Sequence, residues 1–198
     1  MRLLSTVAFR YREDRLTFLR QVVQAHRSIG CDVDIFVLTD TDDSERIALL
    51  REHLGASVNV LSFTDLPNRW YLTWAHKQVL HENFHKDYTH FLYSEDDIAL
   101  TRANVAHWVE NRETLRSSGL YPSFLRVEYS AITHRWVSTD VQNHVRLANA
   151  PSLQIDDEVC FVNLPNPYQG LFFYDRVLMR EHLESDTFHV ARYAGIHA

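Results

Sequence analysis

Short apolar runs alternate with amphipathic segments along the first half of the chain. The run from Leu3 to Phe9 predicts a buried strand. The segment from Asp14 to Ile29 carries apolar residues at helical spacing, so it predicts a helix. Asp14 is expected to cap the start of this helix, and Gly30 is expected to stop it.

The same order of elements continues further along the chain. We expect strands over 33–39, 57–63 and 89–94, and helices over 44–54, 68–86 and 101–118. Strands that alternate with helices favour parallel pairing through right-handed crossovers, with helices on both faces of the sheet. The pattern therefore predicts an α/β fold.

The pattern changes after Gly119 to short extended pieces. Strands are expected over 123–129, 133–138 and 158–162, and a last strand over 170–174 precedes a helix that Asp175 caps and Leu183 ends. The sheet should therefore be mixed but mostly parallel. Because no linker or repeat interrupts the pattern, we expect one domain over residues 1–198.

Composition narrows the class of protein. Hydrophobic residues make up 45% of the 198 residues, which suffices for a sizeable core. The net charge is −6 and no basic stripe occurs, which argues against nucleic-acid binding. The two cysteines, Cys31 and Cys160, fit no zinc pattern and are expected to be buried thiols. No segment approaches the ~18 apolar residues of a membrane span, so we expect a soluble, cytoplasmic protein.

Three consecutive carboxylates, Glu95, Asp96 and Asp97, follow directly on the strand expected at 89–94. Like charges at the end of a buried strand are costly unless a cation compensates them. Hard oxygen ligands suit Mg²⁺ or Mn²⁺, especially when a bound phosphate completes the coordination. The triplet therefore predicts a metal-diphosphate site, although Asp96 or Asp97 could instead only cap the following helix.

The segment Tyr93-Ser94-Glu95-Asp96-Asp97-Ile98 resembles the Glu-Asp-Asp version of the DxD motif in glycosyltransferases of the GT-A fold. Gly170-Leu171-Phe172-Phe173-Tyr174 is similar to the strand before the acceptor site of N-acetylglucosaminyltransferases in that class. The resemblance implies a GT-A-like fold and sugar transfer from a nucleotide-sugar, with UDP as nucleotide, to a carbohydrate or other hydroxyl acceptor.

The resemblance also implies roles for the three carboxylates. Asp97 would bind the metal directly, while Glu95 and Asp96 would contact sugar or ribose hydroxyls, or the metal through water. The metal would stabilise the charge that grows on the departing diphosphate.

Other residues are candidates for binding the nucleotide. Asp40 matches the position where this fold places a carboxylate near the base and ribose, although it also suits an ordinary turn. Arg10 and Tyr11 follow the first strand, where an aromatic ring or a guanidinium could pack on a base. Lys77 could reach a phosphate. An ordinary solvated role is open for the arginine and the lysine.

An inverting transferase also needs a base for the acceptor hydroxyl. The resemblance places this base after the final helix, where Glu184 and Asp186 stand. The acidic cluster 156–158 is an alternative. His189 or His197 could add a late histidine ligand to the metal. Each of these polar residues could equally be only solvated.

Three other functions are compatible with parts of the sequence. A binding module of the same fold would keep the donor site without turnover. A nucleotidyltransferase would also use carboxylates, but it usually has a Gly-rich phosphate loop that the 5 glycines here do not form. His81-Glu82-Asn83-Phe84-His85 fits the H-E-x-x-H pattern of zinc proteases, although no clear third ligand follows at short spacing.

Overall fold

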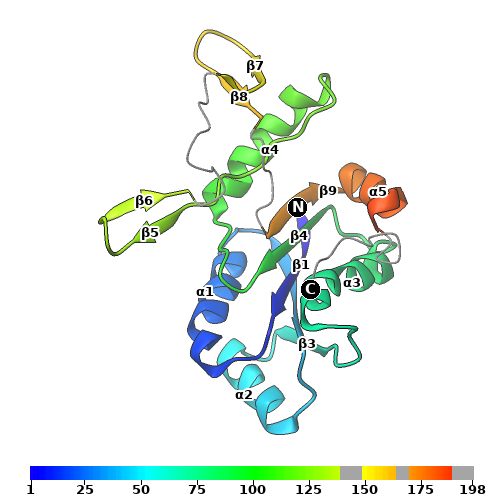
Figure 1. The fold of residues 1–198 in the computed structure, drawn as a ribbon. Coiled ribbons are helices and arrows are strands. Elements are labelled where there is room, and N and C mark those ends of the chain that lie inside the picture. The colour runs from blue at the N-terminus through cyan, green and yellow to red at the C-terminus, as the bar shows by residue number, and fades with distance from the viewer. Residues whose placement is uncertain (139–148, 164–169, 189–198) are drawn as a thin grey trace. The chain divides into compact units, whose positions relative to one another are not determined.

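The computed structural model describes residues 1–138, 149–163 and 170–188, and Figure 1 shows their elements. The chain divides into two compact units. Unit 1 contains Met1–Ala103 and Gly170–Ala198, and unit 2 contains Asn104–Gln169. Unit 2 is therefore inserted into unit 1 in sequence, and the expectation of a single domain stays a prediction.

Unit 1 is built on a five-stranded sheet in the order β3-β2-β1-β4-β9. Strands β1 to β4 are parallel, and β9 runs antiparallel to β4 at one edge. This arrangement confirms the predicted mixed, mostly parallel sheet. The strands are β1 (Arg2–Phe9), β2 (Asp32–Thr39), β3 (Val58–Ser62), β4 (His90–Glu95) and β9 (Leu171–Asp175).

Helices cover both faces of this sheet (Figure 1). Val7 and Phe9 pack toward α1 and α2, whereas Leu4 and Phe91 pack toward α3 and α5. Because both faces are covered, apolar residues on both sides of β1 and β4 are buried, as their sequences predict. The helices of unit 1 are α1 (Leu16–Arg27), α2 (Ser44–Leu54), α3 (His76–Asn83) and α5 (Arg176–Glu184), with 3₁₀ helices η1 (Glu13–Arg15), η2 (Arg69–Trp74) and η4 (Asp186–Phe188).

Two local predictions for unit 1 are wrong. Asp14 does not cap α1, because the Arg12 guanidinium binds both of its carboxylate oxygens. The single helix expected over 68–86 is instead the 3₁₀ helix η2 followed by α3. Arg176 donates to the carbonyls of the residues that follow α3, so the chain can leave the helix after Asn83 without losing hydrogen bonds.

Unit 2 contains most of α4 and two antiparallel ribbons. The ribbons pair β5 with β6 and β7 with β8, and the strand β7 was not expected from the sequence. Cys160 is exposed, contrary to expectation, and Cys31 is half-buried. In the described part of the chain, no helix combines the length and apolar character needed to cross a bilayer. The elements are α4 (Arg102–Arg116), β5 (Glu128–Ser130), β6 (Arg135–Val137), β7 (Ser152–Gln154) and β8 (Cys160–Val162).

Candidate functional site

The carboxyl ends of β1 and β4 form the point where the order of the parallel strands reverses. From β1 the chain continues to β2 and β3 on one side, and β4 returns on the other side. Ala8 pairs with Glu95, so the two strands end level with each other. In open α/β sheets this reversal opens a crevice that binds ligands. The segments after both strands are therefore the candidate site.

Asp40, Arg10 and Tyr11 come together at this edge. The Tyr11 backbone N–H donates to Asp40 Oδ1 over 2.8 Å, and Arg10 Nε lies 3.7 Å from Asp40 Oδ2. Asp40 follows β2, so its carboxylate ties the loop after β1 to the neighbouring strand. The structure thus assembles three residues that the sequence proposed separately as nucleotide contacts.

The Tyr11 ring is packed rather than free. It meets Phe9 edge to face with ring centroids 6.0 Å apart, and the Arg46 guanidinium lies 5.0 Å from its centroid. The hydroxyl is buried without a hydrogen-bond partner among the described residues, and burial raises the pKa of Tyr11. Stacking of this ring on a base stays a prediction that would require Arg46 to move.

Arg15 compensates the carboxylates that follow β4. Its Nε lies 2.7 Å from Asp96 Oδ2, and its Nη2 lies 2.9 Å from both Asp96 Oδ1 and Asp97 Oδ2. The Arg15 guanidinium therefore compensates the negative charges of Asp96 and Asp97. Arg15 was not predicted from the sequence, although its place in η1, just after β1, puts it at the same sheet edge.

Asp96 and Asp97 differ in burial. Asp96 is only 8% exposed, and this burial raises its pKa even though the bonds from Arg15 act in the opposite direction. The side chain of Asp97 is 45% exposed. Hydrogen bonds to both carboxylates raise the pKa of Arg15, which stays charged. Asp96 is therefore a structural partner of Arg15, whereas Asp97 faces outward.

The fit to a divalent cation rests on Asp97. Within the described ranges no group of at least three His, Cys, Asp or Glu side chains could hold a metal. His189 and His197 lie outside the described residues. Mg²⁺ is commonly bound by one or two carboxylates together with substrate phosphates. Asp97 Oδ1 has no hydrogen-bond partner in the described chain, so it suits such a substrate-assisted site.

Glu95 is fixed at the end of β4 by the segment that enters β9. Its backbone N–H donates to the Gly170 carbonyl over 2.9 Å. Gly170 has a positive φ of 60°, and a Cβ at this position would lie 2.9 Å from Glu95 Cδ and 2.9 Å from Ile98 Cδ1. Glycine is therefore needed here for both the backbone conformation and the close approach.

Gly170→Ala is expected to lower the free energy of unfolding by about 2 kcal/mol, because positive φ and a close contact act together. Gly119→Ala is the matched control, since Gly119 also has positive φ but a Cβ there would meet no atom within 4 Å. We expect about 1 kcal/mol for the control. Urea denaturation measures both, and equal losses would show that the contact with Glu95 and Ile98 is unimportant.

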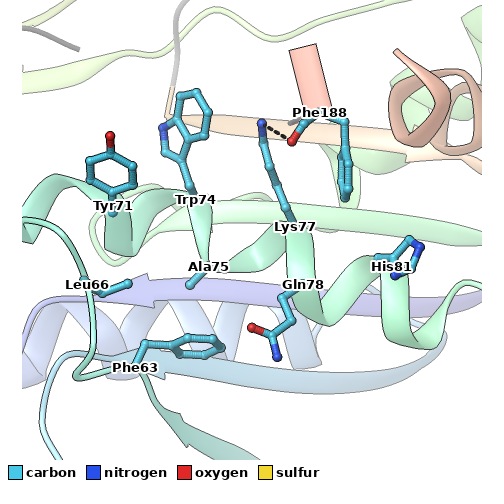
Figure 2. Close-up of a pocket in the computed structure, with 9 residues that line it drawn as sticks. All are labelled: Phe63, Leu66, Tyr71, Trp74, Ala75, Lys77, Gln78, His81 and Phe188. Atoms are coloured by element: carbon cyan, nitrogen blue, oxygen red, sulfur yellow. Dashed lines mark hydrogen bonds between the residues drawn. The ribbon is translucent and has the colours of Figure 1, made fainter. Parts of the chain in front are cut away.

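Lys77 lies in a pocket of about 410 Å³ that is surrounded by residues from the segment after β3, η2, α3 and η4 (Figure 2). Its Nζ donates to the Phe188 carbonyl over 3.0 Å and lies 4.0 Å from the Trp74 ring centroid. Burial lowers the pKa of Lys77 to about 8. The pocket is lined by Phe63, Leu66, Tyr71, Trp74, Ala75, Lys77, Gln78, His81 and Phe188.

The candidates for the base stand in the segment that precedes Phe188 in the sequence. Glu184 ends α5 and is exposed. Asp186 is also exposed and begins η4, two residues before Phe188 of the pocket. The alternative cluster at 156–158 forms the turn between β7 and β8, where Asp156 accepts from two backbone N–H groups. Asp156 is thus engaged in holding the turn.

The H-E-x-x-H pattern does not form the helical zinc site of a protease. Helix α3 ends at Asn83, so His81 and His85 do not share one helix. Glu82 accepts a hydrogen bond from Gln78, and the His81 ring lies 6.2 Å from that of Phe188. The helical face that would present both imidazoles to zinc is therefore missing.

The sequence matches no protein-family model and no curated protein. Among solved structures it is similar to a provisionally assigned nucleotide-diphospho-sugar transferase from Desulfovibrio desulfuricans G20, with 15% identity, a TM-score of 0.41, and coverage of 57% of this chain and 55% of that one. The chain thus spans about half of that protein.

Two further solved structures are similar over most of this chain. One is 4-diphosphocytidyl-2C-methyl-D-erythritol synthase from Anaerococcus prevotii DSM 20548, with 12% identity and a TM-score of 0.46. The match covers 93% of this chain and 76% of that one. The other is residues 1–349 of S. aureus TarS, with 10% identity and a TM-score of 0.46. The match covers 92% of this chain and 49% of that one. The function proposed below rests on the residues of the site itself.

Proposed function

We propose that the protein is a glycosyltransferase that binds a nucleotide-sugar donor, with UDP as nucleotide, at the carboxyl ends of β1 and β4. The observation that carries this proposal is the outward-facing Asp97 carboxylate, which follows β4 at the point of strand reversal. Asp40 and Arg10 pair at the same edge of the sheet. A carboxylate for a cation, a carboxylate for hydroxyls and guanidinium groups for phosphate are the groups such a donor needs.

Each residue of the site contacts a different part of the donor. Asp40 accepts from a ribose hydroxyl with the oxygen that faces away from the Tyr11 N–H. Arg10 and Arg15 supply positive charge to the diphosphate, and Arg15 releases Asp97 as it does so. Glu95 accepts from hydroxyls of the sugar, and Tyr11 borders the base.

Asp97 would hold Mn²⁺ or Mg²⁺, with His189 as a second ligand by resemblance. When bound, the cation acts as a Lewis acid that stabilises the diphosphate leaving group. Asp96 remains with Arg15 and keeps the loop after β4 in place. Asp97 needs only one free oxygen for this role, because phosphate oxygens and water complete the coordination.

Transfer also requires that the acceptor hydroxyl lose its proton. Asp186 is the first candidate for this base and Glu184 the second, since both carboxylates are exposed at the end of α5. The base takes the hydroxyl proton while the acceptor oxygen bonds to the anomeric carbon, and the bond to the diphosphate breaks.

The proposal is tested by calorimetric titration of UDP with and without Mn²⁺. Asp97→Asn should weaken Mn²⁺-dependent binding at least tenfold, because it removes the charged ligand while keeping the shape of the side chain. Glu52→Gln is the control for loss of one charge, since Glu52 is exposed on α2.

Turnover is tested by release of UDP from a panel of UDP-sugars with Mn²⁺. Release that a chelator stops supports the transferase, whereas tight binding without release in the presence of acceptors would identify a binding module instead. Unchanged affinity in Asp97→Asn would remove Asp97 from the site.

A further inference from the structure

The pocket around Lys77 has the composition of a binding site for a ring. Phe63 and Leu66 approach it from the segment after β3, and Tyr71 and Trp74 approach from η2. Figure 2 shows Lys77 extending toward Phe188, with Trp74 beside it. Flat rings of a ligand pack well on aromatic side chains, and a volume of about 410 Å³ lies in the range of small-molecule sites.

Helix α3 supplies three polar side chains to the pocket, beside the Tyr71 hydroxyl and the Trp74 indole of η2. Lys77, Gln78 and His81 contribute an amine, an amide and an imidazole along one stretch of this helix. An amide and an imidazole can bond hydroxyl groups, whereas a primary amine on an apolar wall attracts an acid group. Burial already disfavours the charged amine, and an anion beside it would reverse that effect.

We propose that this pocket binds an acidic sugar, a pyranose-sized ring that carries a carboxylate or a phosphate and pairs that group with Lys77. The ring lies on the aromatic wall of Trp74 and Tyr71. Hydroxyl groups of the ring face Gln78 and His81. Binding of the acidic sugar depends on the pocket alone. The role of this sugar as the acceptor of the transfer rests on the proposed function.

Two backbone connections link the pocket to residues of the proposed function. The Phe63 N–H donates to the Thr39 carbonyl over 2.7 Å, and Thr39 immediately precedes Asp40. At the other end, Phe188 belongs to the 3₁₀ turn that begins with Asp186. The pocket is thus joined through Phe63 to the strand end that precedes Asp40, and through Phe188 to the turn that begins with Asp186. These connections to a predicted donor contact and to the predicted base favour the acceptor as its occupant.

The test uses NMR of the full chain labelled with ¹⁵N, following the indole N–H of Trp74, assigned with Trp74→Phe. Glucuronate and glucose 6-phosphate should shift this signal with saturation, and uncharged glucose should bind at least tenfold more weakly. The two acids distinguish a carboxylate from a phosphate. Lys77→Met should weaken binding of the preferred acid at least tenfold, and Lys86→Met should not, because Lys86 is exposed beyond α3.

A second measurement needs no variant. Lys77 and Lys86 are the only lysines in the sequence, so acetylation of each can be followed by mass spectrometry. The acidic sugar should protect Lys77 and leave Lys86 reactive. Equal binding of glucose and the acids, no saturable shift, or no protection of Lys77 would overturn the proposal.

The donor site is monitored separately by titration of UDP with Mn²⁺. Loss of UDP binding in Lys77→Met with acid binding retained would place Lys77 at the donor phosphate and would also overturn the proposal. If the acidic sugar binds but UDP does not, the pocket is supported as an acidic-sugar site and the proposed function is rejected.

Discussion

Arg15→Met is expected to lower the free energy of unfolding by about 3 kcal/mol, because it leaves Asp96 buried and without its cation. The value is placed at the low end of the range for buried pairs, since the Arg15 side chain is 30% exposed and Asp96 11% exposed. Urea denaturation at neutral pH measures the loss. Arg12→Met, which removes a solvent-exposed pair with Asp14, should cost less than about 1 kcal/mol.

A double-mutant cycle separates the ion pair from other effects. Arg15→Met combined with Asp96→Asn should be more stable than Arg15→Met alone, because no uncompensated charge remains buried. The loss in Arg15→Met should also shrink as pH falls. Burial raises the pKa of Asp96 above its ordinary value, so protonation in acid removes the buried charge in the folded state first. A loss that is constant with pH and purely additive would contradict this account.

Phe91→Ala is expected to cost about 4 kcal/mol, the largest effect of a single substitution proposed for this protein. Phe91 is fully buried in β4 and packs with Phe84 and Tyr88 between the sheet and α3. Its removal leaves a cavity beneath the strand that carries the three carboxylates. Urea denaturation gives the value.

Two controls bracket this loss. Phe91→Leu keeps most of the buried volume and should cost about 1.5 kcal/mol. Phe18→Ala removes a ring that is half exposed on α1 and should cost less than about 1 kcal/mol. If Phe91→Ala and Phe18→Ala lost the same stability, β4 would not be anchored through Phe91.

The elements that depend on local pattern were predicted well. The apolar face of α1 contains the residues that the spacing indicates, and Asp175 caps α5 by accepting from the Leu178 N–H. These features depend on residues within one or two helical turns, which the sequence displays directly. The end of α3 at Asn83, before the predicted end at residue 86, was missed because Arg176, far along the chain, satisfies the carbonyls of the residues that follow.

The candidate site was predicted only in part, because some of its contacts join residues that are far apart in the sequence. The positions of Asp40 and Asp97 follow from strand ends, because parallel strands deliver them to one edge. The partner of Asp96 could not be read from spacing, since Arg15 stands 81 residues away in the sequence. The expectation of Lys77 at a phosphate stays a prediction, and its contacts with the Phe188 carbonyl and the Trp74 ring could not be read from spacing.

The insertion of unit 2 between β4 and β9 affects how the protein is made. At a synthesis rate of about 5–20 residues per second, β9 leaves the ribosome about 4 to 15 s after β4. During that interval one edge of β4 has no partner strand, and its apolar residues Phe91 and Leu92 are available for wrong pairing. Aggregation during expression should therefore depend on the folding speed of residues 104–169, a segment whose described residues contribute no strand to the central sheet.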